Sequence, residues 1–186
     1  MEDVARRIMA LSPEQRALLR ERLAERRADQ PHPEAATDAP LSFAQERWLF
    51  NDRMSPGDPA HAIFGALRLQ GDLSEPALQA SLDGIVSRHA VLRSAFVARG
   101  AETIAHIREV PHFPLERLDL LRSHPNATSD ERETLFRRRY VHETELGFDL
   151  TSDLPIRALL VRLEPRLHVL VVTMHHIVSD GWSLGL

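Results

Sequence analysis

Two adjacent histidines and an aspartate follow a strongly apolar segment near the end of this 186-residue chain. The segment, residues 167–174, is rich in Val and Leu and predicts a buried strand. It leads directly to His175, His176 and Asp180. Imidazole can accept and donate a proton near neutral pH, so a histidine in a loop launched from a rigid strand suits general acid–base chemistry. The sequence therefore places a candidate catalytic base directly after this strand.

The two histidines are not expected to serve the same site. Neighbouring side chains on a strand point to opposite faces, so one histidine should face the chemistry while the other packs or supports it. Asp180 is near enough in sequence to brace the loop, and Gly181 permits a tight turn and a close approach of backbone to a substrate. A metal site is not indicated, because His176 and Asp180 supply two ligands and a catalytic zinc usually has three from the protein.

The composition is that of a globular enzyme domain. The chain has 43% hydrophobic residues, with 23 basic and 27 acidic residues and a formal net charge of −4. This balance offers no basic stripe for a nucleic-acid backbone. Cysteine is absent, which excludes disulfides and a cysteine nucleophile, and charges stand where a secretory signal needs an apolar core. We expect a cytoplasmic protein with no membrane segment, nucleic-acid partner or bound metal.

Composition divides the chain into three regions. Residues 1–27 are charged and helical in pattern, with Ser12 as N-cap and Gln15 reaching back as in a capping box. Residues 28–40 contain three prolines and no apolar periodicity, which is typical of a linker. The globular part is expected to span residues 41–186.

The globular part predicts alternating helices and strands. Helix starts are expected at Ser42, which has capping-box spacing to Gln45, and at Ser74, and a further helix is expected over residues 128–145. In the helix after Ser74 the expected core stripe is Leu78, Leu82, Ile85 and Val86. Strands are expected over residues 61–70, 95–97, 104–107, 156–163 and 167–174. This order predicts a layered α/β fold in which a crossover helix packs on a mixed sheet.

Four segments, in order along the chain, resemble the motifs of condensation domains from non-ribosomal peptide synthetases, members of the chloramphenicol acetyltransferase-like superfamily. Residues 175–181 match the family's H-H-x-x-x-D-G. Residues 42–47, S-F-A-Q-E-R, are similar to the start of S-x-A-Q-x-R-L-W-x-L. Here, however, Trp48 and Leu49 reverse the usual Leu-Trp order.

The other two segments lie between these. Residues 88–96, R-H-A-V-L-R-S-A-F, are similar to R-H-E-x-L-R-T-x-F, with Ala in place of Glu and Ser in place of Thr. Residues 147–150, G-F-D-L, followed by Pro155 and Arg157, fit the family's F-D-L stretch. The resemblance covers residues 41–186, which would form only the N-terminal lobe of a two-lobed domain, with the C-terminal lobe absent from the sequence.

The resemblance implies a layered mixed sheet with helices and a reaction that forms an amide (peptide) bond. A donor acyl or peptidyl thioester and an acceptor aminoacyl thioester, each on the 4'-phosphopantetheine arm of a carrier protein, would meet in a tunnel between the lobes. No cofactor is then bound by the chain directly, and the isolated lobe is expected to be inactive. The implied partners are the donor and acceptor peptidyl carrier proteins and a downstream adenylation domain of an antibiotic-type biosynthetic pathway.

The resemblance also assigns roles to five residues. His176, the second histidine of the motif, would position and deprotonate the acceptor amine, and Gly181 would offer its backbone N–H to the developing oxyanion. Whether His176 acts as a base or as an orienting group stays open. His175 would support the site. Asp180 is expected to be mostly buried and to form an ion pair with Arg88 that holds the loop, because a buried carboxylate is costly unless it is paired.

Several alternatives remain open. Epimerising members of the superfamily typically carry D-x-x-S-W after the doublet, whereas residues 180–183 read D-G-W-S, which favours condensation over epimerisation. An epimerising or other acyltransferase member of the same superfamily is kept as the alternative. Residues 1–27 could form a docking module that recruits an upstream synthase subunit. The arginine run at residues 137–139 is interpreted as a solvated helix face, with a docking patch for acidic carrier proteins as the alternative. Trp48 and Trp182 are interpreted as core aromatics.

Overall fold

The structure is a computed structural model that describes residues 12, 15, 38–100 and 102–180. Contacts divide the chain into two units, Met1–Ala36 and Thr37–Leu186. In the first unit the predicted capping box is present: the Gln15 amide donates to Ser12 Oγ at 3.1 Å, and the Ser12 amide donates to Gln15 Oε1 at 2.9 Å. The rest of the predicted helical appendage and most of the predicted linker lie outside the described residues.

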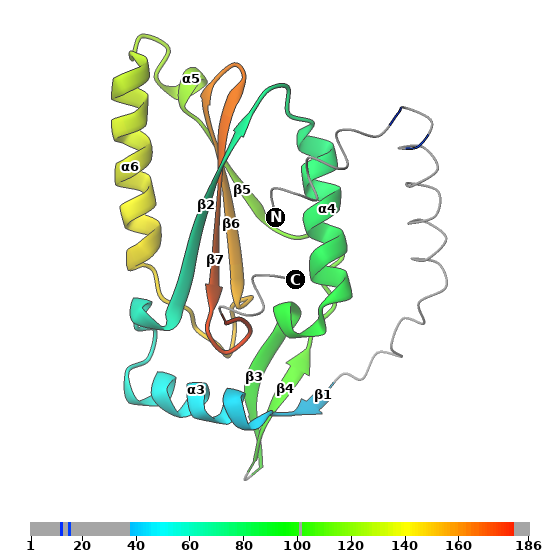
Figure 1. Cartoon of the computed structure of the whole chain (residues 1–186). Coiled ribbons are helices and arrows are strands. Elements are labelled where there is room, and N and C mark those ends of the chain that lie inside the picture. The colour runs from blue at the N-terminus through cyan, green and yellow to red at the C-terminus, as the bar shows by residue number, and fades with distance from the viewer. Residues whose placement is uncertain (1–11, 13–14, 16–37, 101, 181–186) are drawn as a thin grey trace. The chain divides into compact units, whose positions relative to one another are not determined.

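The second unit contains two sheets (Figure 1). Sheet A is antiparallel in the order β1-β4-β3, with β1 at Asp38–Pro40, β3 at Ser94–Arg99 and β4 at Glu102–Ile107. Sheet B has the order β2-β7-β6-β5, with β2 at Ala62–Gln70, β5 at Leu115–Asp119, β6 at Ile156–Glu164 and β7 at Leu167–His175. In sheet B the β5–β6 pair is parallel and the other two pairs are antiparallel. Sheet B is therefore the predicted mixed sheet.

Two short strands were not expected from the sequence. Residues 38–40, placed at the end of the linker by composition, pair with β4 as β1, so the folded unit begins before Leu41. β5, with the sequence Leu-Glu-Arg-Leu-Asp, shows little of the apolar alternation of a strand because it is the edge of sheet B and its middle residues face solvent.

Side-chain caps set the helix starts as predicted. Ser42 and Gln45 form the capping box of α3, and Ser74 accepts from the Ala77 amide at the start of α4. The helices are α3 (Phe43–Met54), α4 (Glu75–Arg88), α5 (Leu120–Ser123) and α6 (Ser129–Glu145), with 3-10 turns at Pro59–His61 and Ala90–Arg93. Among the described residues, no helix combines the length and the apolarity needed to cross a membrane.

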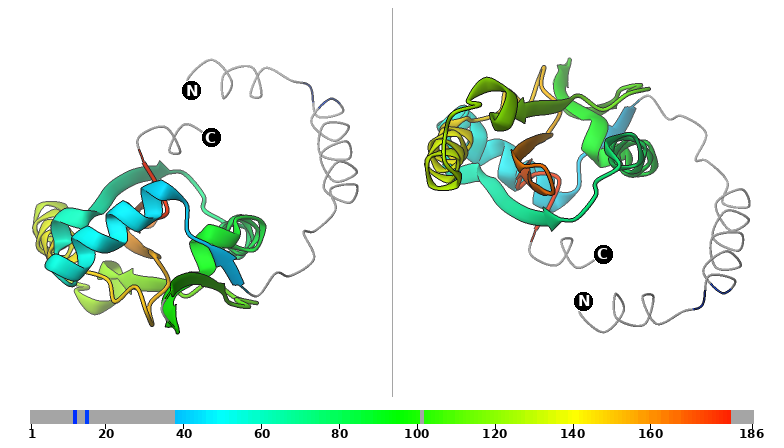
Figure 2. Two further views of the ribbon diagram at one scale, coloured as in Figure 1. Left: turned by 90° about the horizontal axis from the view of Figure 1, so that it is seen from below. Right: turned by 90° about the horizontal axis from the view of Figure 1, so that it is seen from above.

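The central strands β6 and β7 of sheet B are buried on both faces, with α4 on one side and α6 on the other (Figures 1 and 2). Along β6, Ala158 and Leu160 pack in the cluster with α4, whereas Leu159 and Val161 pack in the cluster with α6. Burial on both faces explains why β6 and β7 read as nearly continuous apolar runs. The β5–α6–β6 connection is the predicted crossover, since it joins the two parallel strands.

The expected core stripe of α4 is correct except at Ile85. Leu82 and Val86 are buried, but Ile85 is 48% exposed. The buried face includes Gln79, whose side-chain amide donates to the Phe113 carbonyl at 2.8 Å. Successive residues of a helix point 100° apart around its axis. The mean direction of residues 79, 82 and 86 is therefore about 90° away from the direction of Ile85.

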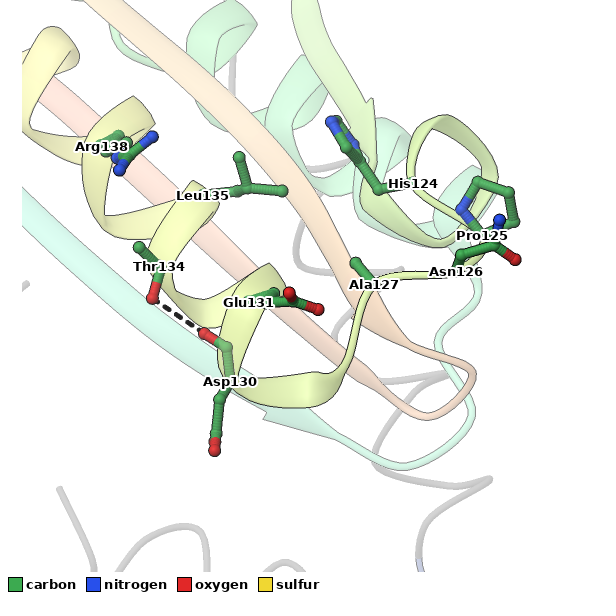
Figure 3. A pocket seen from close by; sticks show the side chains of 9 residues that line it. All are labelled: His124, Pro125, Asn126, Ala127, Asp130, Glu131, Thr134, Leu135 and Arg138. Carbon is green, nitrogen blue, oxygen red and sulfur yellow. Dashed lines mark hydrogen bonds between the residues drawn. The ribbon is translucent and has the colours of Figure 1, made fainter.

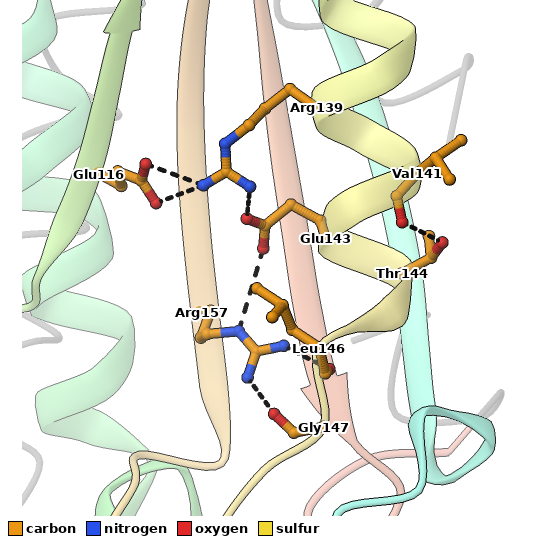
Figure 4. A network of polar contacts seen from close by, with 8 residues as sticks. All are labelled: Glu116, Arg139, Val141, Glu143, Thr144, Leu146, Gly147 and Arg157. Carbon is orange, nitrogen blue, oxygen red and sulfur yellow. Dashed lines mark hydrogen bonds and ion pairs between the residues drawn. The ribbon is translucent and has the colours of Figure 1, made fainter.

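The arginine run on α6 is not one solvated face. Arg137 is exposed and pairs with Glu133. Arg139 instead turns inward and donates to Glu116 at 2.8 Å and to the buried Glu143 (Figure 4). Arg139 is therefore committed to an internal network, so the run cannot act as a uniform basic patch.

Candidate active site at the end of strand β7

The four motif segments meet in one apolar cluster where β7 ends. In Figure 1, α3 lies across this end of sheet B. Each segment contributes to the cluster, whose buried members are Leu49, Phe96, Ala105, Phe148, Leu150 and Ile177. Ile177 is the residue directly after the histidine pair. The loop that carries the histidines is therefore held by residues from the whole length of the folded unit.

His175 is the last residue of β7 and is 1% exposed. Its backbone amide donates to the Pro155 carbonyl at 3.0 Å, and its Nδ1 accepts from the Ile177 amide at 3.0 Å. Because Nδ1 accepts, the neutral ring carries its proton on Nε2. Burial, with repulsion from the nearby His61 and His176 in second place, lowers the pKa of His175 to about 4. Burial and the low pKa leave His175 neutral at pH 7, and its supporting role in the site stays a prediction.

This low pKa predicts acid sensitivity. His175 has a lower pKa folded than unfolded, so between about pH 6.5 and pH 4 the unfolded chain binds more protons. The contribution of neutral His175 is complete above about pH 6.5, and up to about 3 kcal/mol of stability is lost as the pH falls through this window. Urea unfolding of the 186-residue chain at pH 4.5 and pH 7 measures the difference. In His175→Asn, whose amide oxygen can still accept from Ile177, the difference should shrink; an unchanged difference would contradict the assignment.

Asp52 and His61 form a buried polar cluster with His175 that the sequence did not reveal. Asp52 Oδ1 lies 3.8 Å from His61 Nδ1 and 3.8 Å from His175 Nε2. All three atoms are inaccessible to solvent and none has a hydrogen-bond partner within the usual distance. Asp52 belongs to α3 and His61 to the turn before β2, so nothing in the sequence pattern links them to the histidine motif.

The atom types of this cluster would suit a metal ion, but the tautomer of His175 does not. With Nδ1 accepting from the Ile177 amide, a metal on Nε2 would require the imidazolate form of the ring. The arrangement instead fits a carboxylate of Asp52 that faces an imidazole N–H of His175. The tautomer itself is set by the Ile177 amide, because the 3.8 Å separation from Asp52 is beyond hydrogen-bond distance.

His176 differs from His175 in burial and in surroundings. It is partly exposed, and its backbone amide donates to the His61 carbonyl at 2.8 Å. Its imidazole lies flat against the indole of Trp48, with ring centroids 4.6 Å apart and an interplanar angle of 3°. One face of the imidazole is covered, while its nitrogens lie on the ring edge. A histidine held in this way can orient a nucleophile and take its proton.

The two residues predicted to support the loop, Asp180 and Arg88, are not buried as the sequence analysis expected. Asp180 and Arg88 are both exposed, so the expectation that Asp180 is mostly buried is wrong for this structure. The ion pair between them stays a prediction, and between exposed groups it would contribute about 0–1 kcal/mol rather than several. The reason is that water solvates and screens both charges. Gly181, the expected oxyanion donor, and Trp182 lie outside the described residues.

The F-D-L segment packs against the His175 ring. The Phe148 ring meets the His175 ring edge-on, with centroids 6.0 Å apart, and the Arg157 guanidinium lies 3.9 Å from the Phe148 centroid. Arg157 also donates to the carbonyls of Leu146 and Gly147 at 2.8 and 2.7 Å (Figure 4). In the structure this motif packs against His175 and is held by hydrogen bonds from Arg157.

Gly147 in this segment has no room for a side chain. A Cβ at this position would lie 1.8 Å from the Gly57 carbonyl oxygen and 2.5 Å from the Gly57 carbonyl carbon. Because both obstacles are backbone atoms, Gly147→Ala should force the two segments apart and destabilise the unit by about 3 kcal/mol. The matched control is Gly84→Ala on α4, where nothing lies within 4 Å and the substitution should be neutral or stabilising by up to about 1 kcal/mol. Equal urea midpoints for the two variants would contradict the close approach.

A cavity of about 650 Å³ borders the site, and another of similar volume opens elsewhere among the described residues of the second unit. The first lies between α3 and the F-D-L segment, and Asp52, Leu49 and Phe148 are among its lining residues. The other lies between α5 and the start of α6, away from the motif residues (Figure 3). Its Glu131 carboxylate is engaged in the Thr128 capping box. The histidine motif, the polar cluster and the first cavity together make the end of β7 the candidate active site.

Comparison with known proteins places the chain among peptide synthetases. Phosphinothricin tripeptide synthetase PhsC of Streptomyces viridochromogenes is 39% identical over 194 residues, which include 100% of this chain and 17% of PhsC. One of the subunits of linear gramicidin synthase from Brevibacillus parabrevis is 37% identical over 147 residues, which include 79% of this chain and 2% of that protein. The chain thus spans less than a fifth of the length of these relatives.

Solved structures and a family model agree with this placement. The starter condensation domain of rhizomide synthetase RzmA aligns with a TM-score of 0.66 at 20% identity, covering 79% of this chain and 36% of that chain. The four-domain nonribosomal peptide synthetase holo-AB3403 aligns with a TM-score of 0.66 at 19% identity, covering 84% and 11%. These likenesses confirm the predicted fold. The Condensation domain family model matches residues 35–186, a range that includes all four motif segments, and the chain therefore belongs to the condensation domain family.

Proposed function

We propose that this chain supplies the N-terminal lobe of a domain that forms amide bonds in non-ribosomal peptide synthesis. The observation that carries the proposal is the state of His176: a partly exposed imidazole whose backbone is tied to His61 and whose ring is stacked on Trp48, at the meeting point of the four family motifs. The names of the relatives, a tripeptide synthetase and a gramicidin synthase, support the same reaction class.

The reaction needs few protein groups. The acceptor amine nitrogen attacks the carbonyl carbon of the donor thioester, a C–N bond forms, and the C–S bond breaks to release the donor thiol. The proton that leaves the amine is held by His176 and ends on the thiol sulfur, so atoms and charge balance. Holding amine and carbonyl in attack geometry contributes several kcal/mol, and stabilising the carbonyl oxyanion contributes more. We keep the backbone N–H of Gly181 as the proposed oxyanion donor.

The substrates and partners follow from this reaction. The donor and acceptor are proposed to arrive as thioesters on the phosphopantetheine arms of two carrier proteins, with an adenylation domain loading the acceptor. No group of the chain is then needed to bind a cofactor permanently. We propose a cytoplasmic setting, in which carriers and adenylation domains are available to the site.

The test uses the full-length protein that carries this sequence, called here the full-length synthetase. Donor and acceptor carrier proteins loaded with isotope-labelled aminoacyl groups are mixed with it, and mass spectrometry of the acceptor carrier follows the reaction. We expect a dipeptidyl group on the acceptor arm. An acceptor that stays aminoacylated while the donor is hydrolysed would contradict the proposal, and an epimerised aminoacyl group without a new amide would favour the epimerising alternative.

A further inference from the structure

The reversed order of Trp48 and Leu49 decides which side chain meets the candidate base. Consecutive residues of a helix point about 100° apart, so only one of these two can enter the core beneath α3. Leu49 is buried in the apolar cluster, and Trp48 is left partly buried with its indole parallel to the imidazole of His176. With the order that the motif usually has, a leucine would occupy the place of the indole.

Trp48 is itself held from several sides. Its indole meets the His61 ring at 5.8 Å and the His175 ring at 6.5 Å, both edge-on, so three imidazoles surround it. Its backbone lies in the second turn of α3, whose first turn is closed by the Ser42 capping box. A flat ring packed in this way is confined to one plane, and it confines the ring stacked on it to the same plane.

We propose that Trp48 is a positioning residue that fixes the imidazole plane of His176 for amide bond formation; this rests on the proposed function. The hydrogen bond from the His176 amide to the His61 carbonyl holds the backbone of the loop but leaves the side-chain torsions free. The indole face supplies the missing restraint: it blocks rotation of the imidazole and keeps water from one face, while the ring edge stays open. An aliphatic side chain could cover the same face, but it would not impose a plane.

The first arm of the test needs no activity. In the 186-residue chain, the indole ring current should shift the imidazole protons of His176 upfield in the proton NMR spectrum, and loss of these signals in His176→Gln identifies them. Trp48→Leu should move them back toward the positions of an unstacked histidine, whereas Phe43→Leu should not. Phe43 is the matched control because it is an aromatic residue of the same helix that is 86% exposed. Unshifted His176 signals in the parent chain would overturn the proposal.

The second arm measures the steady-state rate of amide formation by the full-length synthetase over a range of loaded-carrier concentrations. Trp48→Leu should lower kcat about tenfold with KM for the loaded carriers unchanged, because misplacement of a catalytic group affects the chemical step. Trp48→Phe, which keeps a flat ring, should restore most of the rate. An unchanged kcat, an effect on KM alone, or no rescue by phenylalanine would each overturn the positioning role. If the parent synthetase forms no amide, the proposed function fails and the positioning role falls with it, while the NMR arm still reports whether the stack exists.

Discussion

His176→Ala is expected to lower the rate of amide formation by the full-length synthetase by about 10²-fold or more, without unfolding it. His176 is the one histidine of the pair that is partly exposed, and its loss removes the group proposed to orient the amine and hold its proton. The measurement is single-turnover transfer between two loaded carrier proteins. Equal rates for variant and parent would refute the assignment of His176.

His175→Asn serves as the control for this experiment. His175 is buried and accepts from the Ile177 amide, so its replacement should change the free energy of unfolding and its pH dependence. Comparing the urea midpoints and the transfer rates of the two variants distinguishes the roles of the two histidines. We expect His176→Ala to keep the parent midpoint while losing activity. The reverse pattern, in which His175→Asn loses the chemical step at full stability, would exchange the two roles.

The 186-residue chain by itself is expected to have no condensation activity. The aligned part covers only 36% of the chain of the solved starter condensation domain, so that domain has much more chain than this one supplies. Orientation and oxyanion stabilisation lower a barrier only when the reacting groups are held together away from bulk water. Purified chain should therefore produce no more dipeptidyl carrier than its His176→Ala variant. Turnover clearly above that variant would show that this lobe suffices.

The exposed apolar side chains of α3 give a separate prediction for the isolated 186-residue chain. Phe43, Phe50 and Met54 are 86%, 63% and 71% exposed and share one side of α3, since they are separated by seven and four residues. Exposed apolar stripes of this kind bind hydrophobic dyes and promote self-association. Dye fluorescence should fall when Phe43 and Phe50 are both changed to serine. If the parent chain binds no dye and stays monomeric, α3 does not present an accessible apolar stripe.

Local pattern was enough to predict most of the elements. Polar caps at Ser42 and Ser74 and the apolar periodicity of β6 and β7 depend on neighbouring residues alone, so they could be interpreted without the fold. The strands β1 and β5 were not predicted from the sequence. Each is short and lies at a sheet edge, where alternate side chains need not be apolar. The motif order predicted the family, which the match over residues 35–186 confirms.

Sequence alone determined that a histidine pair follows a buried strand and that one of the two should face the chemistry. Only the tertiary structure decided which distant groups surround each ring: Asp52 beside His175, and the indole of Trp48 on His176. The physical reason is that periodicity constrains which side of its own element a residue lies on, whereas contacts between distant elements depend on how those elements pack. The same reason explains why Arg139 turns inward and Asp180 stays exposed, since neither direction is encoded in the residues next to it.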